Sequence, residues 1–344
     1  MGQKGTILCD LCSSNEISPL YKAVEGFFGV MRIHGYMICR NCGLVFISPK
    51  PDTEYLNSIY EKTYQAHRFP RGIAKNSLTR KIKKTVYAYH LSSFKTANTY
   101  FSKILYKWFK NYFILPPLTT GKRILDVGCG DGHFLHFFKQ NGWETYGTEV
   151  STSSAIYVGN FGHNIFKGTL NEAHYSRQYF DVIAINHVLE HIANPREMLN
   201  ESYNILRDDG ILVIAVPNFD CFDSKVFRNL WGVVHPPCHL YLFTEKTLKK
   251  YLTSCGFEAL NAQFVPILKS IFTQYSYRSI KSLFGDTYLN EKHVSEKKDV
   301  RIFFSLIRIF LKVFLYKPLY LLFCKNHTKR FSNQVVIYAK KQKP

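Results

Sequence analysis

The run LDVGCGDG at positions 125–132 constrains the fold of this chain more than any other feature. Its apolar first half predicts a buried strand, and its second half places glycines at alternate positions, at Gly128, Gly130 and Gly132. Because glycine has no Cβ and tolerates positive φ, the backbone of such a turn can come close to a ligand. Residues 133–141 then have a helical pattern. The run therefore predicts a strand, a ligand-binding turn and a helix.

An acidic residue, Glu149, ends the next apolar run, YGTEVS. A carboxylate about 20 residues beyond a glycine-rich turn, at the tip of the following strand, can accept hydrogen bonds from both hydroxyls of a ribose. The combination predicts a nucleoside-bearing cofactor. A glycine-rich turn alone also occurs in ordinary strand-to-helix connections. The third glycine comes one residue too early for the GxGxxG spacing of dinucleotide binders, which argues against NAD.

Longer segments of the chain resemble a known family. LDVGCGDGHFL and GTEVS, followed by FDVIAINHVLEHIANP and HLYLFTEKTLKKYLTSCGF, resemble the class I S-adenosylmethionine-dependent methyltransferases over residues 119–265 and the last predicted strand. Upstream, CDLC and CRNCGLVFISPKP resemble the zinc-ribbon leader of one branch of that family, often found in polysaccharide or deoxysugar gene clusters. The two resemblances together are more specific than either alone.

The resemblance implies which residues hold S-adenosylmethionine. They lie at the glycine-rich turn and after the next three strands: Asp126, Gly128, Cys129, Gly130, Gly132, Glu149, Val150, Leu170, Asn186 and His187. After the third strand, family members often carry an acidic residue that meets adenine. This chain instead has the sequence GTLN at 168–171.

Alternating strand and helix patterns predict the α/β class, with a parallel sheet covered by helices on both faces. Helices are expected at 195–206 and 244–255 among others. By resemblance the sheet is a seven-stranded, Rossmann-like methyltransferase sheet, with an N-terminal zinc ribbon before it and a helical insertion before the last strand. That last strand is expected to pair antiparallel at the sheet edge. The expected strands are 123–127, 144–148, 164–166, 180–186, 210–216, 257–264 and 334–340.

Four of the nine cysteines form two CxxC pairs, namely Cys9, Cys12, Cys39 and Cys42. Two such pairs separated by a β-rich segment are typical of tetrahedral zinc, and four protein ligands leave no open position for catalysis, so the zinc would be structural. A redox role is the alternative. Residues 1–50 are too few for a stable apolar core, which a metal would compensate. Without an apolar N-terminal signal, these cysteines indicate a reducing, cytoplasmic location.

The net charge of +20 is concentrated in one part of the chain. Residues 62–123 contain fourteen Lys and Arg and no Asp or Glu, and we interpret 51–118 as a basic helical linker or cap. Residues 101–113 predict a basic amphipathic helix ended by Pro116 and Pro117. Such a segment attracts nucleic acid, an anionic membrane surface or a phosphate-bearing substrate. The alternative is a helix whose aromatic face covers the catalytic domain.

A second unusual segment lies within residues 266–332, before the closing strand at 333–344. Residues 303–323 are strongly apolar, but Arg308, Lys312 and Lys317 interrupt them, so no span of about 18 charge-free residues is reached. An amphipathic helix of this kind lies in a membrane interface or is buried against the core. The first alternative makes the protein peripheral at the inner face of a membrane.

Three histidines are candidate general bases. His191 follows the fourth strand, and His235 and His239 follow the fifth, so all three are expected at the carboxyl edge of the sheet, where ligands bind in α/β folds. Methylation of a hydroxyl, or of an acidic carbon, requires removal of a proton. Residues 187–191 also match the HxxEH motif of zinc proteases, but a strand rather than a helix precedes them. Each histidine is also a candidate for a structural hydrogen bond.

The sequence therefore predicts an S-adenosylmethionine-dependent methyltransferase that acts on a small or lipid-linked acceptor, by resemblance a sugar or polysaccharide precursor. Two alternatives stay open. An RNA-modifying methyltransferase or nucleic-acid binder would use the basic helices, although NHVLEH stands where base-amino methyltransferases carry Asn or Asp before Pro-Pro-aromatic. A noncatalytic zinc-ribbon scaffold would explain the apolar insertion, but the intact glycine turn with Glu149 argues against it.

Overall fold

A computed structural model of the chain describes residues 7–25, 32–52, 54–56, 58–59, 78–92, 100–265, 329 and 332–342. The structural statements below concern these residues. Most of the predicted insertion at 266–332, including the apolar segment 303–323, lies outside them. Among the described residues, no helix combines the length and apolar character needed to cross a bilayer.

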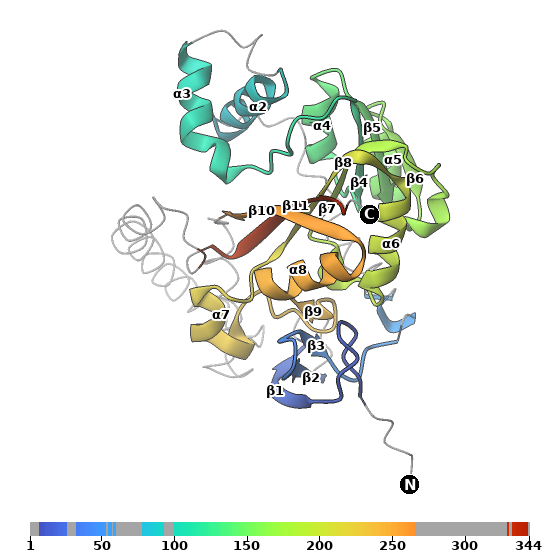
Figure 1. Ribbon diagram of the computed structural model, residues 1–344, viewed down its shortest axis with the longest axis vertical. Coiled ribbons are helices and arrows are strands. Elements are labelled where there is room, and N and C mark those ends of the chain that lie inside the picture. Colours follow the sequence, from blue (N-terminus) through green and yellow to red (C-terminus); the bar gives the residue numbers. More distant parts are fainter. Residues whose placement is uncertain are drawn as a thin grey trace, which may run out of the picture.

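A twisted, mixed sheet of seven strands forms the centre of the molecule, with helices on both sides (Figure 1). Its order is β10-β11-β8-β7-β4-β5-β6. Strands β4 to β8 are parallel to one another, whereas β11 is antiparallel to both β8 and β10. The strands are β4 (Arg123–Val127), β5 (Glu144–Glu149), β6 (Asn164–Lys167), β7 (Phe180–Asn186), β8 (Leu206–Pro217), β10 (Phe257–Val265) and β11 (Gln334–Lys341).

All seven predicted strands are present, and the bounds of β4 and β7 are those predicted. Strand β8 begins earlier than predicted, at Leu206, directly after α6 (Pro195–Ile205). Helix α6 begins at a cap in which the Asn194 side chain accepts from the Glu197 N–H. Helix α8 (Glu245–Ser254) has a capping box between Thr244 and Thr247. Both predicted helices are therefore confirmed to within one residue at each end.

The last strand does not lie at the edge of the sheet, so the prediction of a closing edge strand was wrong. β11 lies between β8 and β10, and β10 forms the edge. The burial of the two strands gives the physical reason. Nearly every residue of QVVIYAKK is buried, whereas in β10 only the first and last residues are. A strand that is apolar on both faces is stabilised in the interior of a sheet, where both faces are covered.

The cysteine-rich N-terminal segment forms a second, four-stranded sheet in the order β1-β2-β3-β9. Its strands are β1 (Ile17–Val24), β2 (Ile33–Cys39), β3 (Val45–Ile47) and β9 (Tyr241–Leu242), the last of which comes from the segment between β8 and α8. The side chains of this sheet join the same buried apolar cluster as one face of the large sheet. In Figure 1 this sheet lies below α8, with β1, β2 and β3 in blue and β9 in yellow. The N-terminal segment is thus packed directly onto the core.

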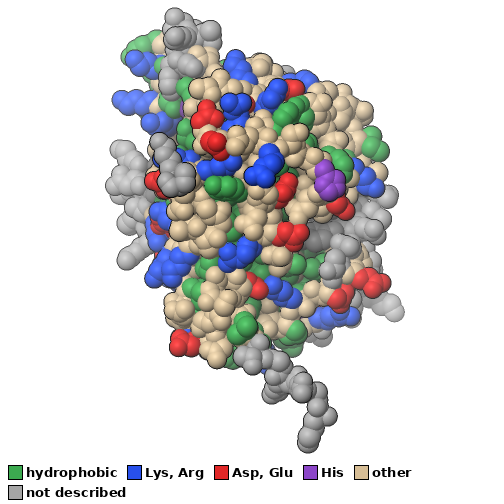
Figure 2. Space-filling model, turned by 45° about the vertical axis from the view of Figure 1, so that its right-hand side comes forward, with side chains coloured by type: hydrophobic (Ala, Val, Ile, Leu, Met, Phe, Trp, Pro, Cys, Tyr) green, Lys and Arg blue, Asp and Glu red, His purple; other side chains and the backbone are tan. Residues whose placement is uncertain are grey.

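Two helices of the basic segment lie at the opposite end of the molecule (Figure 1). Helix α2 (Leu78–Leu91) packs on α4 (His133–Lys139), where the ring of Tyr87 stacks on Phe137 at 4.8 Å between centroids. Helix α3 (Tyr100–Phe109) ends in a 3-10 turn, η1 (Lys110–Tyr112), well before the two prolines that were expected to end it. Figure 2 shows Lys and Arg side chains gathered at this end.

The aromatic face of α3 does not cover the catalytic domain as the alternative interpretation proposed. Phe101 is 64% exposed and Trp108 is 71% exposed. The contact with the core is made instead by the following segment, in which Phe113, Ile114 and Leu115 pack against the second buried cluster.

Candidate functional site

The glycine-rich turn between β4 and α4 has the backbone that the sequence predicted. Gly128, Gly130 and Gly132 all have positive φ, at 66°, 56° and 68°. At Gly128 a Cβ would lie 2.6 Å from a methyl group of Val188, and at Gly132 it would lie 2.5 Å from a methyl group of Val158. At Gly130 it would meet no atom within 4 Å. The first and third glycines therefore allow close packing, and the middle one faces open space.

Glu149 holds this turn from the end of β5. One carboxylate oxygen accepts from the Gly130 N–H at 2.9 Å, and the other accepts from the Ser151 N–H at 2.8 Å. The side chain is buried. Because a carboxylate has about four lone-pair positions, both oxygens retain capacity for further donors such as ribose hydroxyls. The structure thus gives Glu149 a positioning role that the sequence did not predict, beside the predicted one.

A pocket of about 310 Å³ opens beside the turn, within the size range of small-molecule sites. Four of the predicted cofactor residues line it: Asp126, Gly128, Cys129 and Asn186. The other lining residues come from α2, from η1 and the segment after it, from the glycine-rich turn and the start of α4, and from β10 and β11: Lys83, Tyr87, Tyr112, Phe113, Ile114, Asp131, His133, Phe134, Val265 and Gln334. The basic helical segment therefore forms one wall of the predicted cofactor site.

Asp126 and Asn186 lie on adjacent strands at the base of this pocket. The Asn186 amide donates to the Asp126 carboxylate at 3.2 Å, and the Asn186 Oδ1 is buried without a hydrogen-bond partner. Burial raises the pKa of Asp126 from 3.8 to about 7, against the Asn186 hydrogen bond, which lowers it. A buried acceptor without a partner, such as Asn186 Oδ1, beside a buried carboxyl group, such as that of Asp126, is typical of a site that binds a ligand with hydrogen-bond donors.

Lys83 is the cationic member of the pocket wall, and sequence reasoning missed it. Its ammonium lies 4.9 Å from the Phe137 ring centroid and 5.7 Å from that of Tyr87. Desolvation lowers the pKa of Lys83 to about 8, with Asp131 opposing the shift. Its position in a run of basic residues gave no sign that its side chain turns toward the pocket, because the pattern of Lys and Arg around it is continuous.

The other predicted cofactor residues surround the turn without lining the pocket. Leu170 is buried after β6, and Val150 is exposed after β5. His187 follows Asn186 directly, with φ at 56°, a conformation rarely adopted by residues other than glycine. Cys129, by contrast, lines the pocket. Burial, reinforced by Asp126 and Glu149, raises the pKa of its thiol, so this cysteine is a packing residue and not a thiolate.

The three candidate bases come together as predicted. The rings of His191 and His239 are 4.5 Å apart between centroids, and those of His235 and His239 are 5.6 Å apart. His191 lies on a short 3-10 turn, η3 (Leu189–His191), directly after β7. Desolvation lowers the pKa of His191, and it lowers that of His239 further with the help of the neighbouring histidines. Their catalytic role stays a prediction.

The four predicted zinc ligands converge at the base of the N-terminal sheet. The Sγ atoms of Cys9 and Cys42 are 3.5 Å apart, and those of Cys12 and Cys39 are 3.6 Å apart. All four sulfur atoms lie within 4.8 Å of one another. Tetrahedral zinc with Zn–S bonds of about 2.3 Å would place its sulfurs roughly 3.8 Å apart, close to these separations. The cluster is compatible with a zinc site.

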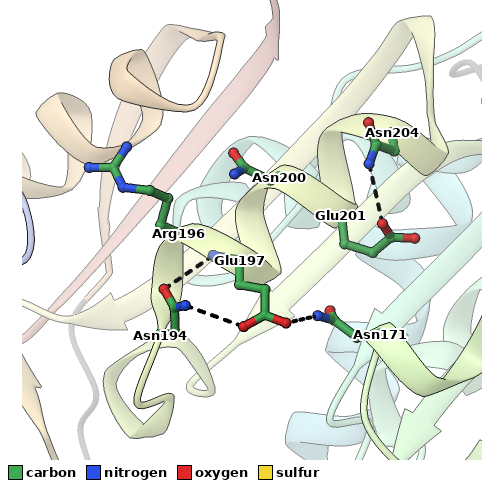
Figure 3. A pocket seen from close by; sticks show the side chains of 7 residues that line it. All are labelled: Asn171, Asn194, Arg196, Glu197, Asn200, Glu201 and Asn204. Carbon is green, nitrogen blue, oxygen red and sulfur yellow. Dashed lines mark hydrogen bonds between the residues drawn. The ribbon is translucent and has the colours of Figure 1, made fainter.

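A second pocket, also of about 310 Å³, lies on the outer side of α6 (Figure 3). It is lined by polar side chains that are largely engaged with one another. Glu197 accepts from Asn171 at 2.5 Å and from Asn194 at 3.2 Å, and Asn204 donates to Glu201 at 3.3 Å. In this pocket the polar side chains mostly bond to one another, whereas most ligand sites are lined by apolar side chains with a few polar groups directed at the ligand.

Comparisons with known proteins agree with the fold. Residues 100–262 match the model of a methyltransferase domain family. A ubiquinone biosynthesis O-methyltransferase of Glaesserella parasuis is 27% identical over 109 residues, which is 28% of this chain and 46% of that protein. A probable S-adenosylmethionine-dependent methyltransferase of Mycolicibacterium smegmatis is 22% identical over 157 residues, 44% of this chain and 59% of that protein. The chain spans about half the length of the curated relatives it matches.

Solved structures of methyltransferases also resemble the chain at low sequence identity. A 1,6-didemethyltoxoflavin-N1-methyltransferase of Burkholderia thailandensis has a TM-score of 0.47 and 13% identity, covering 93% of this chain and all (100%) of that one. An S-adenosylmethionine-dependent methyltransferase of Archaeoglobus fulgidus has a TM-score of 0.41 and 20% identity, covering 70% and 92%. From the sheet order, the glycine-rich turn and the match over residues 100–262, we conclude that the chain has the α/β fold of class I S-adenosylmethionine-dependent methyltransferases.

Proposed function

We propose that this chain transfers the methyl group of S-adenosylmethionine to a small or lipid-linked acceptor. The observation that supports this most directly is the glycine-rich turn, where Gly130 faces open space beside a pocket of about 310 Å³ and Glu149 holds its N–H. The acceptor class that the cysteine-rich leader indicates is a sugar or polysaccharide precursor. The relatives named as ubiquinone biosynthesis O-methyltransferases favour an oxygen acceptor.

The residues around the pocket fit S-adenosylmethionine. A Cβ at Gly128 or Gly132 would collide with packed valines, whereas the space over Gly130 is free for a ligand. The Glu149 carboxylate suits the ribose hydroxyls, and the buried, unpaired Asn186 Oδ1 suits an ammonium donor. The Lys83 ammonium suits a carboxylate. When bound, this cofactor supplies an electrophilic methyl group on a sulfonium.

The histidine cluster has the chemistry of an acceptor site. His191 comes five residues after Asn186, which lines the proposed cofactor pocket, so the chain leads from this pocket into the cluster. Burial lowers the pKa values of His191 and His239, which favours their neutral forms, and a neutral imidazole of this cluster can accept a proton from a hydroxyl or an acidic carbon. Methyl transfer is an in-line displacement, so the protein must otherwise orient the nucleophile and exclude water.

We also propose that the four cysteines bind a structural zinc ion. The separations of their sulfur atoms fit tetrahedral zinc, and four protein ligands leave no coordination position open. The cysteine-bearing sheet also supports the histidine cluster. The Tyr36 hydroxyl donates to the His239 carbonyl at 2.7 Å, and the Ile47 N–H donates to the Leu240 carbonyl at 2.9 Å. Zinc would therefore stabilise the segment that carries His239.

Isothermal titration of the full chain with S-adenosylhomocysteine tests the proposed cofactor site. Gly130→Ala places a methyl group in the space assigned to the cofactor, and we expect affinity to fall at least about 10-fold, or about 1.4 kcal/mol. Gly142→Ala is the matched control, because Gly142 also has positive φ, 75°, and open space around its Cβ, but lies in the turn after α4. Equal affinities of the two variants, or no binding by the unaltered chain, would refute the proposal.

A second proposal concerns α3, which we infer contacts an anionic membrane surface. Phe101 and Trp108 are exposed together with Lys103 and Lys107, and apolar rings among basic residues are typical of helices that lie in a membrane interface. Co-sedimentation with anionic but not neutral vesicles, lost in a Lys103→Glu, Lys107→Glu variant, is the expected result. Salt-dependent RNA binding without vesicle binding would favour the RNA-modifying alternative instead.

A further inference from the structure

Three potential metal ligands converge after β7, apart from the cysteine site. Ligand atoms of Glu190, His191 and His239 all lie within 4.8 Å of one another. Glu190 and His191 come from η3, and His239 comes from the segment just before β9. The two segments are joined by a hydrogen bond from the Leu240 N–H to the Glu190 carbonyl at 2.8 Å. The backbone thus holds the three side chains close together.

Glu190 is buried without the partners that such a carboxylate requires. Its side chain is 1% exposed, and neither carboxylate oxygen has a hydrogen-bond partner. The nearest cationic candidate is His187, whose Nδ1 lies 3.4 Å from one of these oxygens and whose side chain is 40% exposed. An unsatisfied buried carboxylate is expensive in free energy, and native structures avoid it unless a cation or another ligand binds there.

The two histidines are oriented as metal ligands usually are. His191 Nδ1 is 3.0 Å from the Cys238 carbonyl, which fixes the tautomer in which Nε2 carries the lone pair. His239 is hydrogen-bonded to the backbone of Val233, and its Nδ1 is buried without a partner. Metal-binding imidazoles usually donate one ring N–H to a backbone carbonyl or a carboxylate and bind the metal through the other ring nitrogen. Both histidines are placed for this arrangement.

We propose that Glu190, His191 and His239 bind a divalent transition-metal ion. Two imidazoles and one carboxylate favour zinc or iron(II) over magnesium or calcium, which prefer oxygen ligands. Three protein ligands leave coordination positions open, as in catalytic sites and unlike the four-cysteine cluster. The site differs from the zinc-protease interpretation of the HxxEH motif, because His187 is not among the ligands and η3 is not an α-helix.

A metal ion bound by Glu190, His191 and His239 would favour particular methyl acceptors. A metal with open positions binds an acceptor through oxygen atoms, so the acceptor would carry a hydroxyl beside a second oxygen function. This use of the metal rests on the proposed methyl transfer, whereas the metal site itself rests on the geometry alone. With His191 and His239 as ligands, His235 is the histidine of the cluster left to accept the proton.

Cobalt(II) titration of the full chain, loaded beforehand with a single equivalent of zinc for the four-cysteine site, tests the new site. The four cysteines are then occupied, so added Co²⁺ reports on the second site through visible absorption bands without thiolate charge transfer. We expect binding of about one equivalent, weakened about 100-fold or more by Glu190→Gln and by His239→Gln, since loss of a ligand exceeds the 10–100-fold effect of second-shell changes. Glutamine at 239 keeps an N–H donor near the Nε2 position while removing Nδ1.

His174→Asn is the control, since His174 is exposed, ends the 3-10 turn η2 (Asn171–Ala173) outside the ligand cluster, and has φ at 46°, which asparagine tolerates. This variant is expected to bind Co²⁺ like the unaltered chain. Absence of a second Co²⁺ site, or equal binding by all four proteins, would overturn the metal proposal. Parallel titration with S-adenosylhomocysteine separates the two proposals, because cofactor binding without cobalt binding refutes only the metal site, and the reverse refutes only the cofactor site.

Discussion

Gly132→Ala is predicted to destabilise the chain because two separate costs meet at this position. Gly132 is the N-cap of α4 and has φ at 68°, in the left-handed region. A Cβ there would lie 2.5 Å from Cγ1 and 3.1 Å from Cγ2 of Val158. Val158 is fully buried in the cluster that α4 and α5 (Thr152–Gly159) form against the sheet, so it cannot move toward solvent.

The magnitude follows from adding the two costs. A left-handed conformation costs a residue other than glycine about 1–2 kcal/mol. Forcing an extra methyl group into a packed interior costs about 1–3 kcal/mol. We therefore expect Gly132→Ala to lose about 2–5 kcal/mol of the free energy of unfolding. Gly142→Ala, with φ at 75° and no atom within 4 Å of the added Cβ, should lose only the first, about 1–2 kcal/mol.

Urea denaturation of the full chain, followed by circular dichroism, measures these differences. A double-mutant cycle with Val158→Ala isolates the collision, because removing the two methyl groups should relieve it. The coupling free energy between Gly132→Ala and Val158→Ala is expected to be about 1–3 kcal/mol in the stabilising direction. Equal losses for Gly132→Ala and Gly142→Ala, together with additive effects in the cycle, would show that the contact with Val158 does not limit this turn.

Three further predictions concern the cofactor pocket and the cysteine site. Lys83→Met should weaken binding of S-adenosylhomocysteine about 10-fold, because it removes a charged donor to the carboxylate. Binding of methylthioadenosine, which lacks this carboxylate, should be unchanged. A parallel loss of affinity for both ligands in calorimetry would contradict the contact assigned to Lys83. The pKa of Asp126 is about 7 in the folded chain and near 3.8 when unfolded, so folding takes up a proton between these pH values and the free energy of unfolding falls as pH rises from about 4 to 7. Asp126→Asn should remove this loss of stability, up to about 4 kcal/mol, as measured by urea titration across that pH range. Identical pH profiles for the variant and the unaltered chain would refute this prediction. Cys42→Ser should abolish binding of one zinc ion and lower the melting temperature, and a chelator should then lower the melting temperature no further through the cysteine site. Unchanged zinc content by mass spectrometry would rule out Cys42 as a ligand.

The local signals in the sequence predicted most of the large sheet. Strands β4 and β7 were placed correctly because their runs of buried, apolar residues are bounded by glycine or polar residues. The turn after β4 was predicted because positive φ at Gly128, Gly130 and Gly132 requires glycine, a requirement that is visible in the sequence itself. The spacing of the four cysteines likewise indicated that their sulfur atoms would meet.

What joins segments distant in the sequence was decided only by the tertiary structure. β11 lies inside the sheet because its two apolar faces need cover, and β9 pairs with β3, which places Tyr36 against the backbone of His239. Packing between distant segments also turns Lys83 toward the proposed cofactor pocket and brings Glu190 close to two imidazoles. Periodicity along a chain records which face of an element is buried, but the partner that buries it comes from elsewhere in the sequence, and only packing selects it.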